Sequence, residues 1–181
     1  MKPGAAVDTH AHVARTRPAW TTRPGWRAPR SSLVLGGLVL AAVLSTRWVR
    51  LNGSPSVPYG LYRLAPITLP LTRGTLVVLP VPPVVRPWHA RWVPLLKPVA
   101  AVAGDLVCVW EAGLFVAGQW YGAVWQKASG RPLPQVRGCF RVPEGAVFLA
   151  SPFPKSLDGR YWGITPVADL TAQAIPLITW R

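Results

Sequence analysis

Prolines and glycines constrain the fold of this chain more than any other feature. Its 181 residues include 21 prolines and 16 glycines, spread along most of its length. Proline disrupts a helix interior because it lacks the amide proton and clashes with the preceding turn. Short strands joined by turns accommodate both residue types. We therefore expect an all-β domain and exclude a helical bundle.

Short apolar runs bounded by turn residues are the expected strands. Residues 106–110 and 114–117 flank the turn Glu111-Ala112-Gly113, and this spacing predicts a hairpin. The polar, glycine-rich residues 119–134 are expected to form an exposed loop. The remaining expected strands are residues 76–79, 95–102, 146–150 and 172–180.

One apolar run near the N-terminus is longer than the others. Residues 33–44 carry no charge, and with the flanking serines and threonine they reach about 17 residues, the lower limit for a membrane-spanning helix. A cleavable signal peptide is the alternative, but residues 45–48 make a poor small-x-small cleavage site. We expect residues 31–50 to be an uncleaved transmembrane signal anchor.

Residues 1–30 are rich in proline and arginine and show no helical or strand periodicity. This composition is typical of a disordered basic tail. Positively charged residues before a membrane helix stay in the cytoplasm, so residues 51–181 are expected to form a domain outside it.

The formal net charge of +14 suits either a nucleic-acid binder or a protein at an anionic membrane. Arginines are scattered through the domain and not clustered, so we favour the membrane and expect no nucleic-acid partner. His10 and His12 form an H-x-H pair in the tail without further ligands at useful spacing. We therefore expect neither a metal nor a cofactor.

Two isolated polar residues are candidates for chemistry. Ser56 lies between Pro55 and Pro58, which hold the backbone close to an extended conformation, so its hydroxyl could serve as a nucleophile. A linker that leaves the membrane is the alternative.

Lys97 is the only polar side chain among residues 93–101. If it is desolvated, its amine becomes neutral and can take a proton from serine; otherwise it extends into solvent.

A third candidate is the segment SPFPKSLDGRYWG at residues 151–163. Its last eight residues, 156–163, combine a serine, a carboxylate, a guanidinium and two aromatic rings. Asp158 and Arg160 could form a bidentate ion pair that holds a loop in place. The alternative is a structural turn with a surface ion pair of little energetic value.

Together these segments resemble the three conserved blocks of the signal peptidase type I superfamily, in order and in approximate separation. Members of this superfamily are serine peptidases with a Ser-Lys dyad and an N-terminal membrane anchor. The resemblance extends from about residue 51 to the end, and it is greatest to the conjugative-transfer (TraF-type) branch. It implies a signal-peptidase-like fold of twisted antiparallel sheets in a partial barrel. The blocks are residues 56–58, 97–105 and 156–163.

The resemblance also implies a role for each of six polar residues. Ser56 would attack the scissile carbonyl, and Lys97 would act as a neutral general base. Ser54 would donate to the oxyanion, and Ser156 would orient the lysine. Asp158 and Arg160 would brace the closing loop as an ion pair.

The function implied is that of a single-pass serine endopeptidase of the bacterial inner membrane with a periplasmic catalytic domain. It would process an exported pilin-like precursor in conjugative transfer (type IV secretion) and cut after small residues. Its partners would be the precursor, the lipid bilayer and other components of the conjugation apparatus. The alternatives are a general type I signal peptidase for many secreted proteins, or a non-catalytic basic assembly or DNA-binding protein.

Cys108 and Cys139 both lie beyond the expected anchor. In an oxidising compartment we expect them to form one disulfide that closes a loop of about 30 residues. Two free, buried cysteines are the alternative.

Overall fold

The computed structural model of the chain describes residues 34–38 and 48–180. Residues 34–38 are helical, and in the part of the chain described no helix has the length and apolarity needed to span a bilayer. The expected tail and most of the expected anchor lie outside the described residues. Residues 48–180 belong to a separate compact unit.

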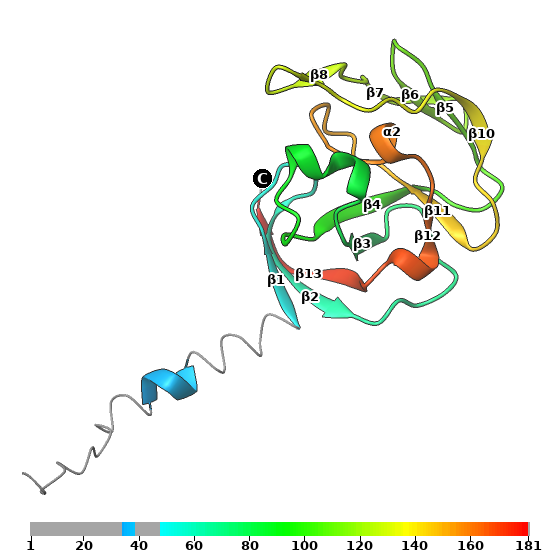
Figure 1. The fold of residues 1–181 in the computed structure, drawn as a ribbon. Helices are drawn as coiled ribbons and strands as arrows, with labels where there is room; N and C mark the ends of the chain where they lie inside the picture. The colour runs from blue at the N-terminus through cyan, green and yellow to red at the C-terminus, as the bar shows by residue number, and fades with distance from the viewer. Residues whose placement is uncertain (1–33, 39–47, 181) are drawn as a thin grey trace, which may run out of the picture. The chain divides into compact units, whose positions relative to one another are not determined.

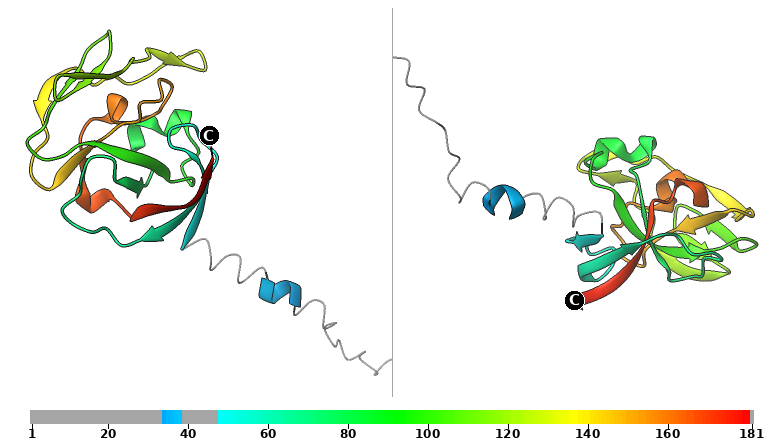
Figure 2. Two further views of the ribbon diagram at one scale, coloured as in Figure 1. Left: turned by 180° about the vertical axis from the view of Figure 1, so that it is seen from behind. Right: turned by 90° about the horizontal axis from the view of Figure 1, so that it is seen from below.

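Seven antiparallel strands form the larger sheet of this unit, in the order β1-β2-β13-β3-β4-β11-β12 (Figure 1). The last strand lies between β2 and β3, so the two ends of the unit pair with each other. The sheet curls into a half-barrel, as the two views of Figure 2 show. Its strands are β1 (Val49–Asn52), β2 (Tyr59–Ala65), β3 (Leu76–Leu79), β4 (Leu95–Ala101), β11 (Ala146–Leu149), β12 (Thr165–Pro166) and β13 (Ala172–Trp180).

Two smaller sheets complete the unit. The first has four antiparallel strands in the order β10-β5-β6-β7, and the second is the pair β8-β9. Their strands are β5 (Leu106–Val109), β6 (Leu114–Val116), β7 (Gln119–Gly122), β8 (Lys127–Ala128), β9 (Arg131–Pro132) and β10 (Gly138–Arg141). Three short helices connect the strands: η1 (Pro83–Trp88), α2 (Gly159–Trp162) and η2 (Val167–Asp169).

Strand β11 is apolar along its whole length, and β4 is apolar except for Lys97; nearly every residue of both strands is buried. On one face, Val99 and Phe148 belong to a core that includes Val107 of the four-stranded sheet. On the other face, Leu96 belongs to a smaller apolar cluster with Val57. Val57 follows Ser56 directly, so this cluster fixes the segment between β1 and β2 to the sheet.

The all-β expectation is confirmed, and so is the predicted hairpin, which is formed by β5 and β6. The expectation of an exposed loop at residues 119–134 is wrong. This stretch contains β7, β8 and β9, and it buries Val124 and Leu133. Isolated apolar residues in a polar, glycine-rich stretch gave no periodic signal, yet they pack inward. The larger sheet begins at Val49, two residues before the expected start of the domain.

The two cysteines are joined by a disulfide, so the alternative of two free thiols is excluded. Cys108 of β5 and Cys139 of β10 lie directly opposite each other in the antiparallel ladder. The bond therefore ties two neighbouring strands of the four-stranded sheet.

Candidate active site

Lys97 is buried in the middle of the curled sheet. It lies on β4, pairs with Val77 of β3, and its side chain is 4% exposed. Burial removes the ammonium group from water and lowers the pKa of Lys97 to about 8, an effect that nearby Asp158 opposes and Arg160 adds to. The alternative of a lysine that extends into solvent is therefore wrong, and a neutral amine is accessible close to neutral pH.

Two serines from distant parts of the chain meet at the Lys97 amine. Nζ of Lys97 donates to Oγ of Ser56 at 2.8 Å and to Oγ of Ser156 at 2.9 Å. Ser56 lies in the turn between β1 and β2, and Ser156 lies in the loop that leads to α2. Both serines are buried. The structure thus brings together the expected nucleophile, base and orienting hydroxyl.

Asp158 and Arg160 form an ion pair with both side chains fully buried. Asp158 is the N-cap of α2, and its carboxylate accepts from the backbone N–H of Arg160 at 3.2 Å and of Ser151 at 3.0 Å. The second guanidinium nitrogen of Arg160 donates to the carbonyl of Ser151 at 2.8 Å. The alternative of a weak surface ion pair is therefore wrong, because every one of these contacts is shielded from water.

Ser151 begins the third candidate segment, but the sequence reasoning gave it no role in the site. Its hydroxyl donates to the backbone carbonyl of Ser56 and accepts from the backbone N–H of Phe153 at 3.0 Å. Through its own backbone it contacts both Asp158 and Arg160. A serine that directly follows the buried strand at residues 146–150 was the only available sequence signal.

Asn52, at the end of β1, was also missed. Its side chain is buried and forms hydrogen bonds with the backbone of the Ser56 segment. Ser54 lies in the same segment, and its hydroxyl donates to Oδ1 of Asn52 at 3.0 Å. The expected oxyanion donor is thus bonded to asparagine and is not part of the Lys97 cluster.

A groove of about 340 Å³ opens over this cluster. Its walls are the end of β1 with the following turn, and the residues that enter β4. Arg50 connects the two walls, because its guanidinium donates to the carbonyl of Pro94. Strand β1 is an edge of the sheet, so an extended peptide in the groove could pair with it. Ser54, Ser56 and Lys97 all line this groove.

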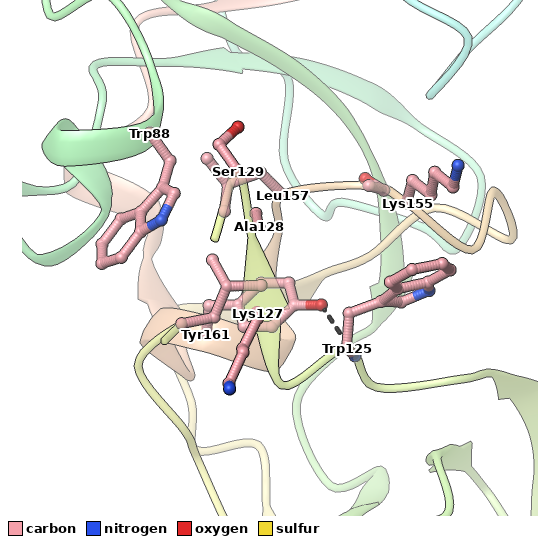
Figure 3. A pocket seen from close by; sticks show the side chains of 10 residues that line it. Trp88, Trp125, Lys127, Ala128, Ser129, Lys155, Leu157 and Tyr161 are labelled. Atoms are coloured by element: carbon pink, nitrogen blue, oxygen red, sulfur yellow. Dashed lines mark hydrogen bonds between the residues drawn. The ribbon is translucent and has the colours of Figure 1, made fainter. Parts of the chain in front are cut away.

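A second cavity, of about 350 Å³, shares Lys155 and Leu157 with the groove (Figure 3). Trp88 of η1, Trp125 and Tyr161 contribute aromatic walls. The hydroxyl oxygen of Tyr161 accepts from the backbone N–H of Trp125 at 3.1 Å, and this bond fixes the stretch predicted as a free loop. Residues 125–133 therefore form one wall of this second cavity, next to the groove.

Among residues 34–38 and 48–180 no three His, Cys, Asp or Glu side chains gather where they could hold a metal ion. The H-x-H pair at His10 and His12 lies outside the described residues.

Comparisons with known proteins identify relatives and a family for this chain. The protein named probable conjugal transfer protein TraF from Sinorhizobium fredii is 33% identical over 171 residues, which cover 82% of this chain and 89% of that protein. The conjugal transfer protein TraF of Agrobacterium fabrum is 29% identical over 167 residues, covering 83% and 92% respectively.

Among solved structures, a signal peptidase I from Enterococcus faecalis matches with a TM-score of 0.35 and 16% identity, covering 60% of this chain and 98% of that one. The family model described as signal peptidase, peptidase S26, matches residues 30–180. The chain therefore belongs to the S26 family of signal peptidases.

Proposed function

We propose that this protein is a serine endopeptidase in which Ser56 is the nucleophile and Lys97 is the general base, and that it processes an exported precursor in conjugative transfer. One observation carries the dyad: the buried Lys97 amine lies 2.8 Å from the Ser56 hydroxyl. A lysine in an apolar site can act as a base because its neutral form is favoured.

The arrangement supports a definite sequence of proton transfers. A neutral amine has two N–H groups and one lone pair, so it can donate to Ser156 while its lone pair accepts the proton of Ser56. Oγ of Ser56 then bonds to the scissile carbonyl carbon. The protonated Lys97 returns its proton to the leaving amine as the peptide bond breaks. Water hydrolyses the resulting acyl-enzyme, again with Lys97 as the base.

The negative charge that develops on the carbonyl oxygen needs hydrogen-bond donors. The backbone N–H of Ser56 and the hydroxyl of Ser54 are the proposed pair. The Asp158–Arg160 ion pair and Ser151 hold the surrounding loops, because Ser151 connects that pair to the Ser56 carbonyl. These fixed contacts preorganise the site at no cost during the reaction.

The groove beside the edge strand β1 supports an extended substrate that pairs with β1. The names of the two relatives support conjugative transfer as the setting. The resemblance to the conjugative-transfer branch supports a pilin-like precursor with small residues before the cut. We place the catalytic domain in the periplasm, anchored by residues 31–50 after a basic tail at residues 1–30. Exposed apolar side chains near the groove, Leu51 and Trp92, support contact with the bilayer; Trp92 is 78% exposed.

The test is processing of a pilin-like precursor co-expressed with the full chain. Ser56→Ala and Lys97→Ala should each reduce processing by a factor of about a thousand or more, since both remove a reacting group. Arg141→Ala, which removes an exposed cation from β10 of the four-stranded sheet, should leave processing unchanged. Normal processing by either dyad variant would rule out the proposed mechanism.

A general signal peptidase is a second candidate, favoured by the match to the family model. The purified protein separates the two: cleavage of unrelated secreted precursors at rates similar to that of the pilin-like precursor would establish the general function.

A further inference from the structure

The segment between β1 and β2 lacks two backbone N–H donors, because Pro55 and Pro58 have none. One side chain compensates for this. The two N–H groups of Asn52 Nδ2 face three carbonyls, those of Ser54 at 2.8 Å, Val57 at 3.1 Å and Pro58 at 3.0 Å, so that one N–H is shared between two of them. Asn52 is 6% exposed, so these bonds are largely shielded from water. A single amide therefore holds the backbone on both sides of Ser56.

The other half of the same amide holds Ser54. Oδ1 of Asn52 accepts from the backbone N–H of Ser54 at 3.3 Å and from its hydroxyl at 3.0 Å. A hydroxyl carries only one proton to donate. Ser54 therefore cannot donate to Asn52 and to a substrate oxyanion at the same time.

We propose that Asn52 is a positioning residue that controls where the Ser54 hydroxyl points. In the free protein Oδ1 of Asn52 holds this hydroxyl at the groove wall. As the tetrahedral intermediate forms, the hydroxyl rotates and donates to the oxyanion, and Oδ1 keeps its bond to the Ser54 backbone N–H. The inference rests on the proposed function, since it takes Ser54 as the oxyanion donor.

The side-chain chemistry explains why asparagine suits this position. Asparagine is a short side chain that carries both N–H donors and a carbonyl acceptor. Aspartate would present an oxygen to the three carbonyls that Nδ2 now contacts. Glutamine would keep both groups but move them one methylene further from the backbone.

The test is a double-mutant cycle on the full-length protein with Asn52→Ala and Ser54→Ala. The probe is a quenched fluorescent peptide with alanine at the first and third positions before the cut, and kcat, KM and Tm are measured for each variant. Ser54→Ala should lower kcat by about 10²–10³, the usual cost of one oxyanion donor. Asn52→Ala should lower kcat by roughly tenfold or more with little change in KM, because without the Oδ1 bond to its backbone N–H Ser54 is no longer held where its hydroxyl can reach the oxyanion, which exists only in the transition state.

The interaction between the two positions is decisive. In the Ser54→Ala background there is no hydroxyl to direct, so Asn52→Ala should cost at most about threefold in kcat. An equal loss in both backgrounds would overturn the proposal, because Asn52 would then act only by holding the backbone. The same conclusion follows if Asn52→Ala leaves kcat unchanged.

If Asn52→Ala is too unstable to assay, the cycle is repeated with Asn52→Gln, which keeps the donors and the acceptor but misplaces them. A kcat loss confined to the Ser54 background supports the proposal, and equal losses overturn it.

Ser56→Ala is measured in parallel. Cleavage by Ser56→Ala would refute the proposed dyad, and the positioning role with it. An inactive Ser56→Ala protein with an additive cycle would refute the positioning role alone.

Discussion

The seven-stranded and four-stranded sheets are both antiparallel, but they are held together by different means. In the larger sheet, distant loops are joined by buried polar contacts around Lys97, Asp158 and Arg160. In the smaller sheet, two adjacent strands are joined by the Cys108–Cys139 disulfide. The polar contacts place reactive groups relative to one another, whereas the disulfide restricts only the chain. We therefore expect changes in the first region to affect activity and stability together, and changes in the second to affect stability alone.

The two sheets meet at Arg160. Gly122, the last residue of β7, has a φ of +145°, and a Cβ added there would lie 2.8 Å from Nη2 of Arg160. Tyr121 of the same strand donates from its hydroxyl to the carbonyl of Ala150 at 3.2 Å. The four-stranded sheet thus helps to cover the guanidinium and to keep water from it.

The largest effect is expected from Arg160→Ala. It leaves the Asp158 carboxylate buried and unpaired, and it removes a donor from the Ser151 carbonyl. Breaking a buried ion pair in this way typically costs about 3–5 kcal/mol in the free energy of unfolding. Urea unfolding and peptide cleavage would be measured on the same samples, and both should decline.

The matched control is Arg141→Ala, in β10 of the smaller sheet. Arg141 is exposed and donates to the carbonyl of Gly104, so its loss should cost less than about 1 kcal/mol. Arg160→Ala protein with full activity would contradict the distinction between the two regions.

Removal of the disulfide tests whether the four-stranded sheet affects stability alone. Its cysteines are 31 residues apart in sequence, and in the chain-entropy model a loop of this size stabilises by about 3–4 kcal/mol. The double variant Cys108→Ser, Cys139→Ser should lose about this much stability, while kcat at a temperature where it remains folded stays within about twofold of the original. A parallel loss of kcat would show that the smaller sheet also positions the reactive groups.

The pH dependence of kcat/KM tests the role of Lys97 in the larger sheet. With the pKa of Lys97 at about 8, kcat/KM should rise as pH increases through 8 and fall tenfold per unit below it. At pH 6 it should be about one hundredth of its plateau. The disulfide-free variant should give the same profile, since its changes lie away from Lys97. A profile that is flat between pH 6 and 9 would contradict Lys97 as the base.

The pKa of Lys97 also determines the direction in which stability changes with pH. Its folded-state pKa of about 8 lies below the ordinary value of 10.5, so between these values the unfolded chain holds a proton that the folded chain does not. The contribution of Lys97 to the free energy of unfolding therefore increases as pH rises from about 8 towards 10.5. Lys97→Met should remove this dependence in urea titrations.

Much of the fold and of the site was predictable from the sequence. Prolines and glycines exclude long helices, so the all-β class follows from local backbone geometry. The turn at residues 111–113 predicts the β5–β6 hairpin because its two strands are neighbours in sequence. The three blocks that resemble signal peptidases contain Ser56, Lys97 and Ser156, and the S26 family assignment confirms that resemblance.

Tertiary structure alone decided the environment of these residues. The apolar run around Lys97 favoured an amine in solvent and left a buried amine open, because burial of this lysine depends on segments 41 and 59 residues away. The same holds for Asp158 and Arg160, which are two residues apart on the chain and are buried where β7 and the backbone of Ser151 lie against them. Asn52 and Ser151 received no role from the sequence because their importance lies in contacts with the backbone of other segments. Local patterns record which side chains a strand or turn can hold, whereas desolvation and hydrogen-bond partners arise only when distant segments close over one another.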